Sequence, residues 1–109
     1  MIVYCNNIIL ADEVSIADNF IRRFFGLMGR TNLVAGEGLL LWKCPSIHCF
    51  FMKISIDAVY LTSNMTVLGF ETLKPWSIGR HYKKTAHVLE LGEGSAALRV
   101  NVGDRLVFI

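Results

Sequence analysis

The stretch from residue 44 to residue 57, CPSIHCFFMKISID, concentrates side chains that could do chemistry. Cys44, His48 and Cys49 are of the types that bind zinc. Residues four apart on an extended strand are ~13 Å apart, and adjacent residues point to opposite faces. Because the chain has no C-x-x-C pair, the spacing does not favour a metal site, and we expect no cofactor. A tetrahedral zinc set would have to be completed from His81, His87, Cys5 or Asp57.

Cysteine-based catalysis would need a thiol within hydrogen-bond reach of an imidazole. His48 and Cys49 point apart on a strand, whereas Cys44 reaches His48 only if a turn lies between them. A pairing of Cys49 with His81 or His87 stays open. The sequence therefore assigns no catalytic residue, and a binding protein is favoured over an enzyme.

Two carboxylates lie inside apolar runs, Asp57 between KISI and AVYL and Glu90 within HVLELGEG. A buried carboxylate is costly unless it is paired. Asp57 is therefore predicted to form a salt bridge or to face a ligand, and Glu90 has the same two interpretations. Either carboxylate could also orient His48 as a general base, which is the hydrolase-like alternative. The candidate cations for Asp57 are Arg23, Arg30 and Lys53.

The segment 73–85, LKPWSIGRHYKKT, is polar and contains proline and glycine, so it is predicted to be a long exposed loop. Its cations are interleaved with aromatic residues, a mixture that can bind an anionic or single-stranded polymer. The patch is isolated and the net charge of the chain is only +2, so we expect no nucleic-acid partner. A protein-interaction module that uses this loop or a sheet edge is a further alternative.

Length and composition predict a single domain over residues 1–109. Hydrophobic residues make up 53% and charged residues 18%, which excludes intrinsic disorder. The apolar runs are too short for a membrane helix and no secretory signal is evident, so we expect a cytoplasmic protein without membrane contact. Three irregularly spaced cysteines indicate reduced thiols. Either a monomer or a homodimer is compatible with the sequence.

The periodicity predicts one helix and several strands. Residues 16–25 place Ile16, Phe20 and Phe24 on one apolar stripe, with Ser15 as N-cap and Gly26 at the end. SNMT at 63–66 is predicted to be a hairpin turn. The fold class is therefore mostly β (α+β), a compact antiparallel β-sandwich or partly open barrel of about six to seven short strands with one helix. The predicted strands are 8–11, 38–43, 48–53, 56–62, 66–72, 86–91 and 104–109.

Four motifs, RRFFGLMGRTNL, CPSIHCFFMKISID, KPW and HVLELGEG with a later GD, occur in this order along the chain. Together they resemble the domain-of-unknown-function 192 family, from about residue 10 to the C-terminus. The resemblance implies a compact, mostly β fold and no established activity. Where the family has threonine after the histidine, this chain has Cys49, a poorer hydrogen-bond donor. The motif positions are Arg23, Gly26, Leu27, Met28 and Arg30, then Cys44, His48, Phe51, Met52 and Asp57, then Lys74, Pro75 and Trp76, then Glu90, Gly94, Gly103 and Asp104.

Taken together, the motifs and the residue types predict a shallow pocket near His48 and Asp57 that binds a small ligand or a peptide segment. The partner is therefore an unknown small ligand or protein. The residues predicted to line this pocket are Arg23, Arg30, His48, Met52, Asp57 and Glu90.

Overall fold

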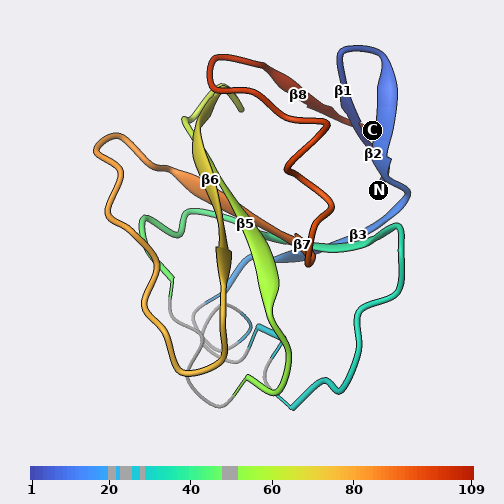
Figure 1. Ribbon diagram of the computed structural model, residues 1–109. Coiled ribbons are helices and arrows are strands. Elements are labelled where there is room, and N and C mark those ends of the chain that lie inside the picture. Colours follow the sequence, from blue (N-terminus) through green and yellow to red (C-terminus); the bar gives the residue numbers. More distant parts are fainter. Residues whose placement is uncertain (20–21, 23–25, 28, 48–51) are drawn as a thin grey trace.

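The structure is a computed structural model that describes residues 1–19, 22, 26–27, 29–47 and 52–109. Over these residues the chain is mostly β, with two sheets (Figure 1). The smaller sheet has the order β2-β1-β8 and the larger one the order β3-β4-β7-β5-β6. The strands are β1 (Val3–Cys5), β2 (Ile8–Ala11), β3 (Glu13–Ala17), β4 (Glu37–Leu41), β5 (Ile56–Leu61), β6 (Val67–Leu73), β7 (His87–Gly92) and β8 (Leu106–Phe108).

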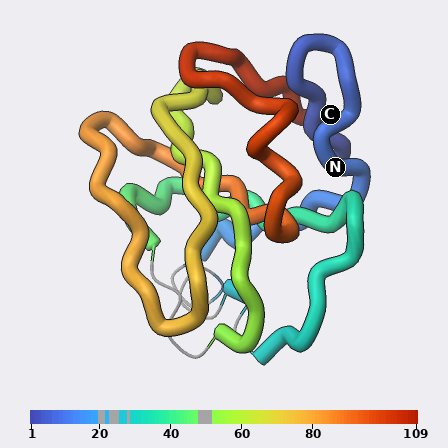
Figure 2. The backbone as a smooth tube through the Cα atoms, viewed as in Figure 1, coloured from blue at the N-terminus to red at the C-terminus, as the bar shows by residue number. Residues whose placement is uncertain are grey.

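The smaller sheet joins the two ends of the chain. β1 and β2 form a hairpin whose turn residues, Asn6 and Asn7, have positive φ angles of 53° and 64°, as a two-residue hairpin of type I′ requires. β8 pairs with β1 on the other side, and Ile2 and Ile109 exchange two backbone hydrogen bonds of 2.8 Å. The two termini therefore lie close together (Figure 2).

Two links connect the sheets. Asp12 is the single residue between β2 and β3, so one bent segment contributes a strand to each sheet. At the opposite side an isolated bridge joins Thr66 to Arg105. At the Asp12 side, Met1 and Val14 also exchange two backbone hydrogen bonds of 2.9 Å. The described strands of the two sheets form no longer ladder with one another, so the sheets do not form a closed barrel.

The pairing of β3 with β4 corrects the prediction of an antiparallel fold. These strands run parallel, from Glu13 opposite Glu37 to Ala17 opposite Leu41. The intervening segment 18–36 returns the chain to the end of the sheet at which β3 begins. A parallel pair of strands requires such a crossover. The other strand pairs of the described sheets are antiparallel.

The predicted helix over residues 16–25 is not supported. Ile16 and Ala17 belong to β3, and Ser15 lies within that strand instead of capping a helix. The Asn19 side chain accepts a hydrogen bond of 2.9 Å from the Arg22 amide, and the Arg22 carbonyl accepts one from Gly26. Residues 20–21 and 23–25 lie outside the described residues. No helix of the described part of the chain is long and apolar enough to cross a membrane.

Most of the predicted strands are confirmed, with shifted ends. The runs 8–11, 38–43, 56–62, 66–72, 86–91 and 104–109 correspond to β2, β4, β5, β6, β7 and β8. The predicted turn joins β5 to β6, with hydrogen bonds between the backbones of Thr62 and Thr66 and of Met65 and Thr62. The predicted strand 48–53 is wrong at Met52 and Lys53, which are not in a strand, and its first four residues lie outside the described part. The sequence also missed β1 and β3.

The central strands of the larger sheet, β5 and β7, are buried on both faces. Val59 and Leu89 pack on the face toward the smaller sheet, in what we call the first core. Ala58 and Val88 pack on the opposite face, in the second core. Because side chains alternate along a strand, neighbouring residues of β5 and β7 enter different cores. The second core also contains Ala17, Leu27, Leu41, Ile47, Met52, Ile56, Tyr60 and Leu73.

The long loop predicted at 73–85 is confirmed between β6 and β7, and two glycines hold it against the sheet. A Cβ atom at Gly69 would collide with the Tyr82 ring, and one at Gly79 would collide with the Tyr60 hydroxyl. The Tyr60 and Tyr82 rings lie 4.7 Å apart. The loop therefore packs on the sheet only because these two positions carry no side chain.

Substituting Gly69 by alanine tests this packing. We expect Gly69→Ala to lower the free energy of unfolding by about 1–3 kcal/mol, because the added methyl displaces the Tyr82 ring. Urea denaturation measures the effect. In a Tyr82→Leu background the same substitution should cost much less, since the clashing ring is gone. Equal costs in both backgrounds would contradict the contact.

Candidate functional site

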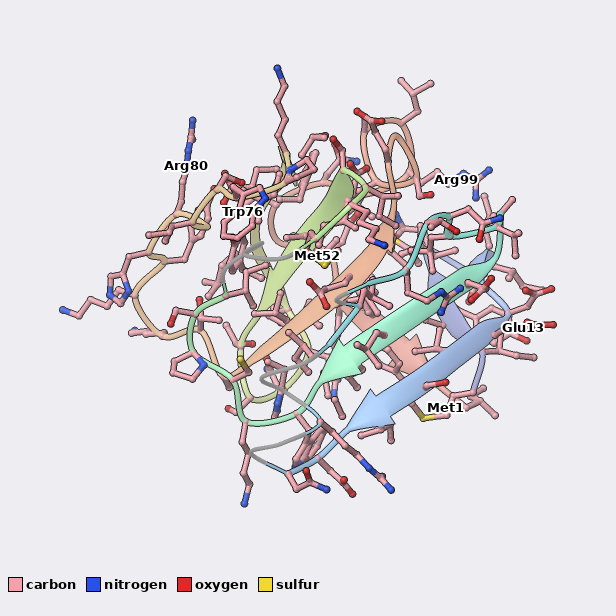
Figure 3. All side chains as sticks on the ribbon, turned by 90° about the horizontal axis from the view of Figure 1, so that it is seen from below. Met1, Glu13, Met52, Trp76, Arg80 and Arg99 are labelled. Carbon is pink, nitrogen blue, oxygen red and sulfur yellow. The ribbon has the colours of Figure 1, made fainter. Side chains whose placement is uncertain are left out.

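Glu90 is a carboxylic acid in the middle of β7, and its side chain is only 3% exposed. It pairs with Leu39 of β4 on one side and with Ala58 of β5 on the other. Ala58 and Leu39 both belong to the second core, so Glu90 projects into that core among apolar side chains. Figure 3 views this face of the sheet, with Met52 near its centre.

The carboxyl group of Glu90 takes part in no side-chain hydrogen bond or ion pair with the described residues. Burial raises its pKa from 4.5 to about 8. At neutral pH the group is therefore protonated, and it presents one O–H donor together with acceptor oxygens. A buried carboxyl group with a strongly raised pKa, set among apolar side chains of the described residues, is a candidate for a functional site.

Asp57 faces the opposite side of the sheet. It precedes Ala58 on β5, and its carboxylate enters the first core. One oxygen accepts a hydrogen bond of 2.8 Å from the Thr72 hydroxyl and the other accepts one of 2.9 Å from the Ala96 amide. Asp57 thus anchors the turn after β7 to the sheet, and it does not line a common pocket with Glu90.

Arg30 forms an ion pair with Glu37 instead of the predicted salt bridge with Asp57. Its guanidinium donates a hydrogen bond of 2.8 Å to Glu37, at the start of β4. This bond lowers the pKa of the Glu37 carboxyl below its usual value. The other Glu37 oxygen accepts a hydrogen bond from the Val34 amide. The pair therefore ties the crossover segment to the start of β4.

A hollow of about 460 Å³ opens beside this ion pair, between the crossover segment and strands β3 and β4. Leu39 lines the hollow and is also the direct neighbour of Glu90 across the strands. Glu90 itself does not line the hollow, so Leu39 is the residue that links the two. The other lining residues of the hollow include Glu13, Leu27, Arg30, Leu33 and Glu37.

The remaining predicted pocket residues divide into two groups. Met52 is 5% exposed and belongs to the second core, on the same face as Glu90. Arg23, His48 and Cys49 lie outside the described residues, so their roles stay predictions. The structure thus brings Met52, Glu90 and the Arg30 segment to one side of the sheet and sends Asp57 to the other.

The two described cysteines among the metal candidates, Cys44 and Cys5, lie in different parts of the fold. The Cys44 thiol donates a hydrogen bond of 3.0 Å to the Ser46 carbonyl beside the second core. Cys5 is buried in the first core, where burial raises the pKa of its thiol to about 11. Among the described residues no group of three His, Cys, Asp or Glu side chains is placed to hold a metal ion.

His87 is a structural histidine at the start of β7. Its Nδ1 atom accepts a hydrogen bond of 2.9 Å from the Lys43 amide, and its ring stacks on Trp42 with centroids 4.1 Å apart. Burial lowers the pKa of the imidazole, with a smaller effect of the Lys43 charge. The neutral ring therefore packs at the start of β7. It lies on the opposite face of the sheet from Glu90.

One polar network was not anticipated from the sequence. The Tyr60 hydroxyl, on the second-core face of β5, donates a hydrogen bond of 2.6 Å to Glu71 of β6. The same Glu71 oxygen accepts a hydrogen bond of 2.7 Å from the Arg80 amide in the long loop. The signal in the sequence is a tyrosine within a strand of otherwise apolar residues, since a buried hydroxyl needs a partner.

The raised pKa of Glu90 predicts a pH-dependent stability. Between pH 4.5 and about 8 the folded state holds a proton that the unfolded chain has lost. Stability therefore falls as pH rises through this window, by at most about 1.4 kcal/mol per pH unit, and levels off above it. We expect Glu90→Gln to remove this slope in urea titrations at successive pH values. The exposed Glu93→Gln should retain it, and a wild-type slope in Glu90→Gln would refute the assignment.

The two hydrogen bonds of Asp57 predict a different outcome for that residue. An Asp57→Asn side chain keeps one acceptor oxygen, but its NH₂ group must face either the Ala96 amide or the Thr72 hydroxyl. We expect a loss of about 1–3 kcal/mol in the free energy of unfolding, because a buried amide loses its acceptor. Thermal or chemical denaturation measures this loss. A variant as stable as the wild type would show that the anchor is unimportant.

Comparisons with known proteins agree with the resemblance found in the motifs. The family model DUF192, described as "Uncharacterized ACR, COG1430", matches residues 4–108. A UPF0127 protein of Pyrococcus abyssi is 41% identical over 89% of this chain and 86% of its own length. A UPF0127 protein of Pyrococcus furiosus is 38% identical over 86% of this chain and 84% of its own length. A crystal structure of a protein of unknown function from Novosphingobium aromaticivorans shares the fold, with a TM-score of 0.79 at 23% identity over 87% of this chain and 74% of that one. The chain is therefore a member of the uncharacterised DUF192 family.

Proposed function

We propose that this domain binds a small ligand or a peptide side chain on the second-core face of the larger sheet, with Glu90 as the polar contact. The observation that carries the proposal is a carboxyl group that is 3% exposed and has no partner among the described residues. Ligand sites are mostly apolar with a few placed polar groups. Glu90 among the apolar residues Leu39, Ala58 and Met52 fits that description.

The protonation state of Glu90 indicates the chemistry of the ligand. A neutral carboxyl group donates one hydrogen bond and accepts others. A carboxamide, amide or ketone on a largely apolar molecule is its natural complement, whereas a carboxylate ligand would be repelled once Glu90 ionises. Binding to the protonated form weakens as pH rises through the pKa of about 8.

The hollow lined by Leu39 supports the proposal, because it offers a ligand space on the second-core side of the larger sheet. Its rim carries the Arg30–Glu37 ion pair, which holds the crossover segment at one position. Met52 and Arg30 of the sequence-based set therefore remain in the proposal together with Glu90. Arg23 and His48 remain expected contributors, and Asp57 leaves the set because it faces the first core.

A thermal-shift screen of small amides, carboxamides and ketones at about pH 6 tests the proposal, with calorimetry of the hits. We expect a hit to bind wild type about tenfold more weakly at about pH 9. Glu90→Leu should abolish binding, because the polar contact is lost. Glu90→Gln should bind with little pH dependence, because its neutral amide keeps a donor and an acceptor.

Asp57→Asn is the matched control, since it disturbs a buried carboxylate of the same sheet on the other face. It should melt at a lower temperature and still bind the hit with wild-type affinity at a temperature where it is folded. A hit that binds Glu90→Leu as tightly as the wild type would overturn the proposal. So would a screen in which no compound stabilises the wild type.

A further inference from the structure

The loop between β6 and β7, residues 74–86, presents an alternating set of side chains to solvent. Lys74, Trp76, Ile78 and Arg80 are exposed, whereas the three residues between them are half-buried. Trp76 is 60% exposed and Ile78 is 69% exposed. One side of this segment thus carries two apolar side chains flanked by two cations, and we call these four residues the loop stripe.

Contacts with the sheet hold the loop stripe in place. The Gly79 amide donates a hydrogen bond of 3.1 Å to the Ile47 carbonyl, and the Arg80 amide donates one of 2.7 Å to Glu71. The Tyr82 ring packs where Gly69 has no side chain. A backbone that is already fixed loses less entropy when a partner binds, so the stripe is preorganised for recognition.

Trp76 is held at a conformational cost. Its φ angle is 66°, in the left-handed region that favours glycine and disfavours a bulky side chain by roughly 1–2 kcal/mol. The turn around it is closed by the Ser77 amide and hydroxyl, which both donate to the Lys74 carbonyl. A large aromatic residue kept in this conformation and mostly exposed is a feature that often marks function.

The charge of the chain is concentrated in this loop. The loop carries four basic residues and no acidic residue, whereas the whole chain has eleven basic and nine acidic residues. The rest of the chain therefore has seven basic and nine acidic residues, a net charge of −2. The basic residues of the loop are Lys74, Arg80, Lys83 and Lys84.

We propose that the loop is a docking site for an extended acidic segment of a partner protein. An apolar side chain of that segment packs on Trp76 and Ile78, and its carboxylates meet Arg80, Lys83 and Lys84. The loop runs up one side of the molecule and then turns back toward β7 in an outward bend (Figures 1 and 2). The Arg80 Nε atom lies 3.8 Å from a Glu71 oxygen, and in Figure 3 the Arg80 side chain extends away from the molecule, where its guanidinium can also meet such a segment.

The same features favour a peptide over the other polyanions. Single-stranded nucleic acid needs several aromatic rings for successive bases. In this fully described loop the Tyr82 ring is packed over Gly69 and against Tyr60, so Trp76 is the large aromatic residue that remains exposed. The negative remainder of the chain also opposes a long polyanion.

A synthetic peptide of glutamate residues interspersed with leucine is the probe. The chain has two tryptophans, and a Trp42→Phe background leaves Trp76 as the fluorescent reporter. We expect the peptide to shift Trp76 emission to shorter wavelength as the ring leaves water. Raising the salt concentration should weaken binding, because carboxylates meet exposed cations.

Matched charge reversals locate the site. Lys83→Glu and Arg99→Glu each change the net charge of +2 to zero, but only the first lies in the loop. We expect Lys83→Glu to weaken peptide binding about tenfold and Arg99→Glu to leave it within about twofold. Trp76→Asn, whose side chain tolerates a positive φ, should lose binding when it is measured at a temperature at which the variant is folded.

Three outcomes would overturn the docking proposal. One is that the peptide produces no change in Trp76 emission or in calorimetry. Another is that both charge reversals weaken binding equally, which would indicate a nonspecific charge effect. The last is that oligothymidylate or phosphatidylserine vesicles bind more tightly than the peptide through the same residues. None of these readouts involves Glu90, so the two proposals stand or fall separately.

Discussion

The burial of both faces of the central strands is the constraint on which the rest of the structure depends. All six residues of β5 are buried, and so are the first five of β7. Two layers are needed to keep such strands from water. The smaller sheet, made from both ends of the chain, supplies one layer. The crossover after β3 and the segment before β5 supply the described part of the other.

Because the central strands are buried on both faces, the carboxyl groups of Asp57 and Glu90 lie in different surroundings. Asp57 enters the core between the sheets, where the Thr72 hydroxyl and the Ala96 amide satisfy both oxygens. Glu90 enters the other core, where apolar side chains surround it and burial raises its pKa to about 8. The Asp57 carboxylate stabilises the fold through these two hydrogen bonds. At pH values above the pKa that Glu90 has in the unfolded chain, its buried carboxyl group lowers the stability of the folded state. A role in binding would explain this cost.

Much of the β structure could be predicted from runs of branched and aromatic residues, because such runs fit a pleated surface. Residues 16 and 17 could not, since their apolar spacing with the residues that follow matches a helix while both pair with β4. Tertiary pairing overrode a local pattern there. The candidate site was anticipated in part: both buried acids were singled out, but a continuously apolar strand does not reveal which face each residue occupies.

The sequence by itself determined the family, the number of domains expected, most of the strands and the presence of two acids that had to be either paired or functional. These follow from residue types and local spacing. Only the tertiary structure decided that Asp57 accepts two hydrogen bonds in the first core while Glu90 lies in the second core with a raised pKa. It also decided that β3 and β4 run parallel, and that Gly69 and Gly79 allow the basic loop to pack onto the sheet. Each of these depends on contacts between residues far apart in the chain, which no local pattern encodes.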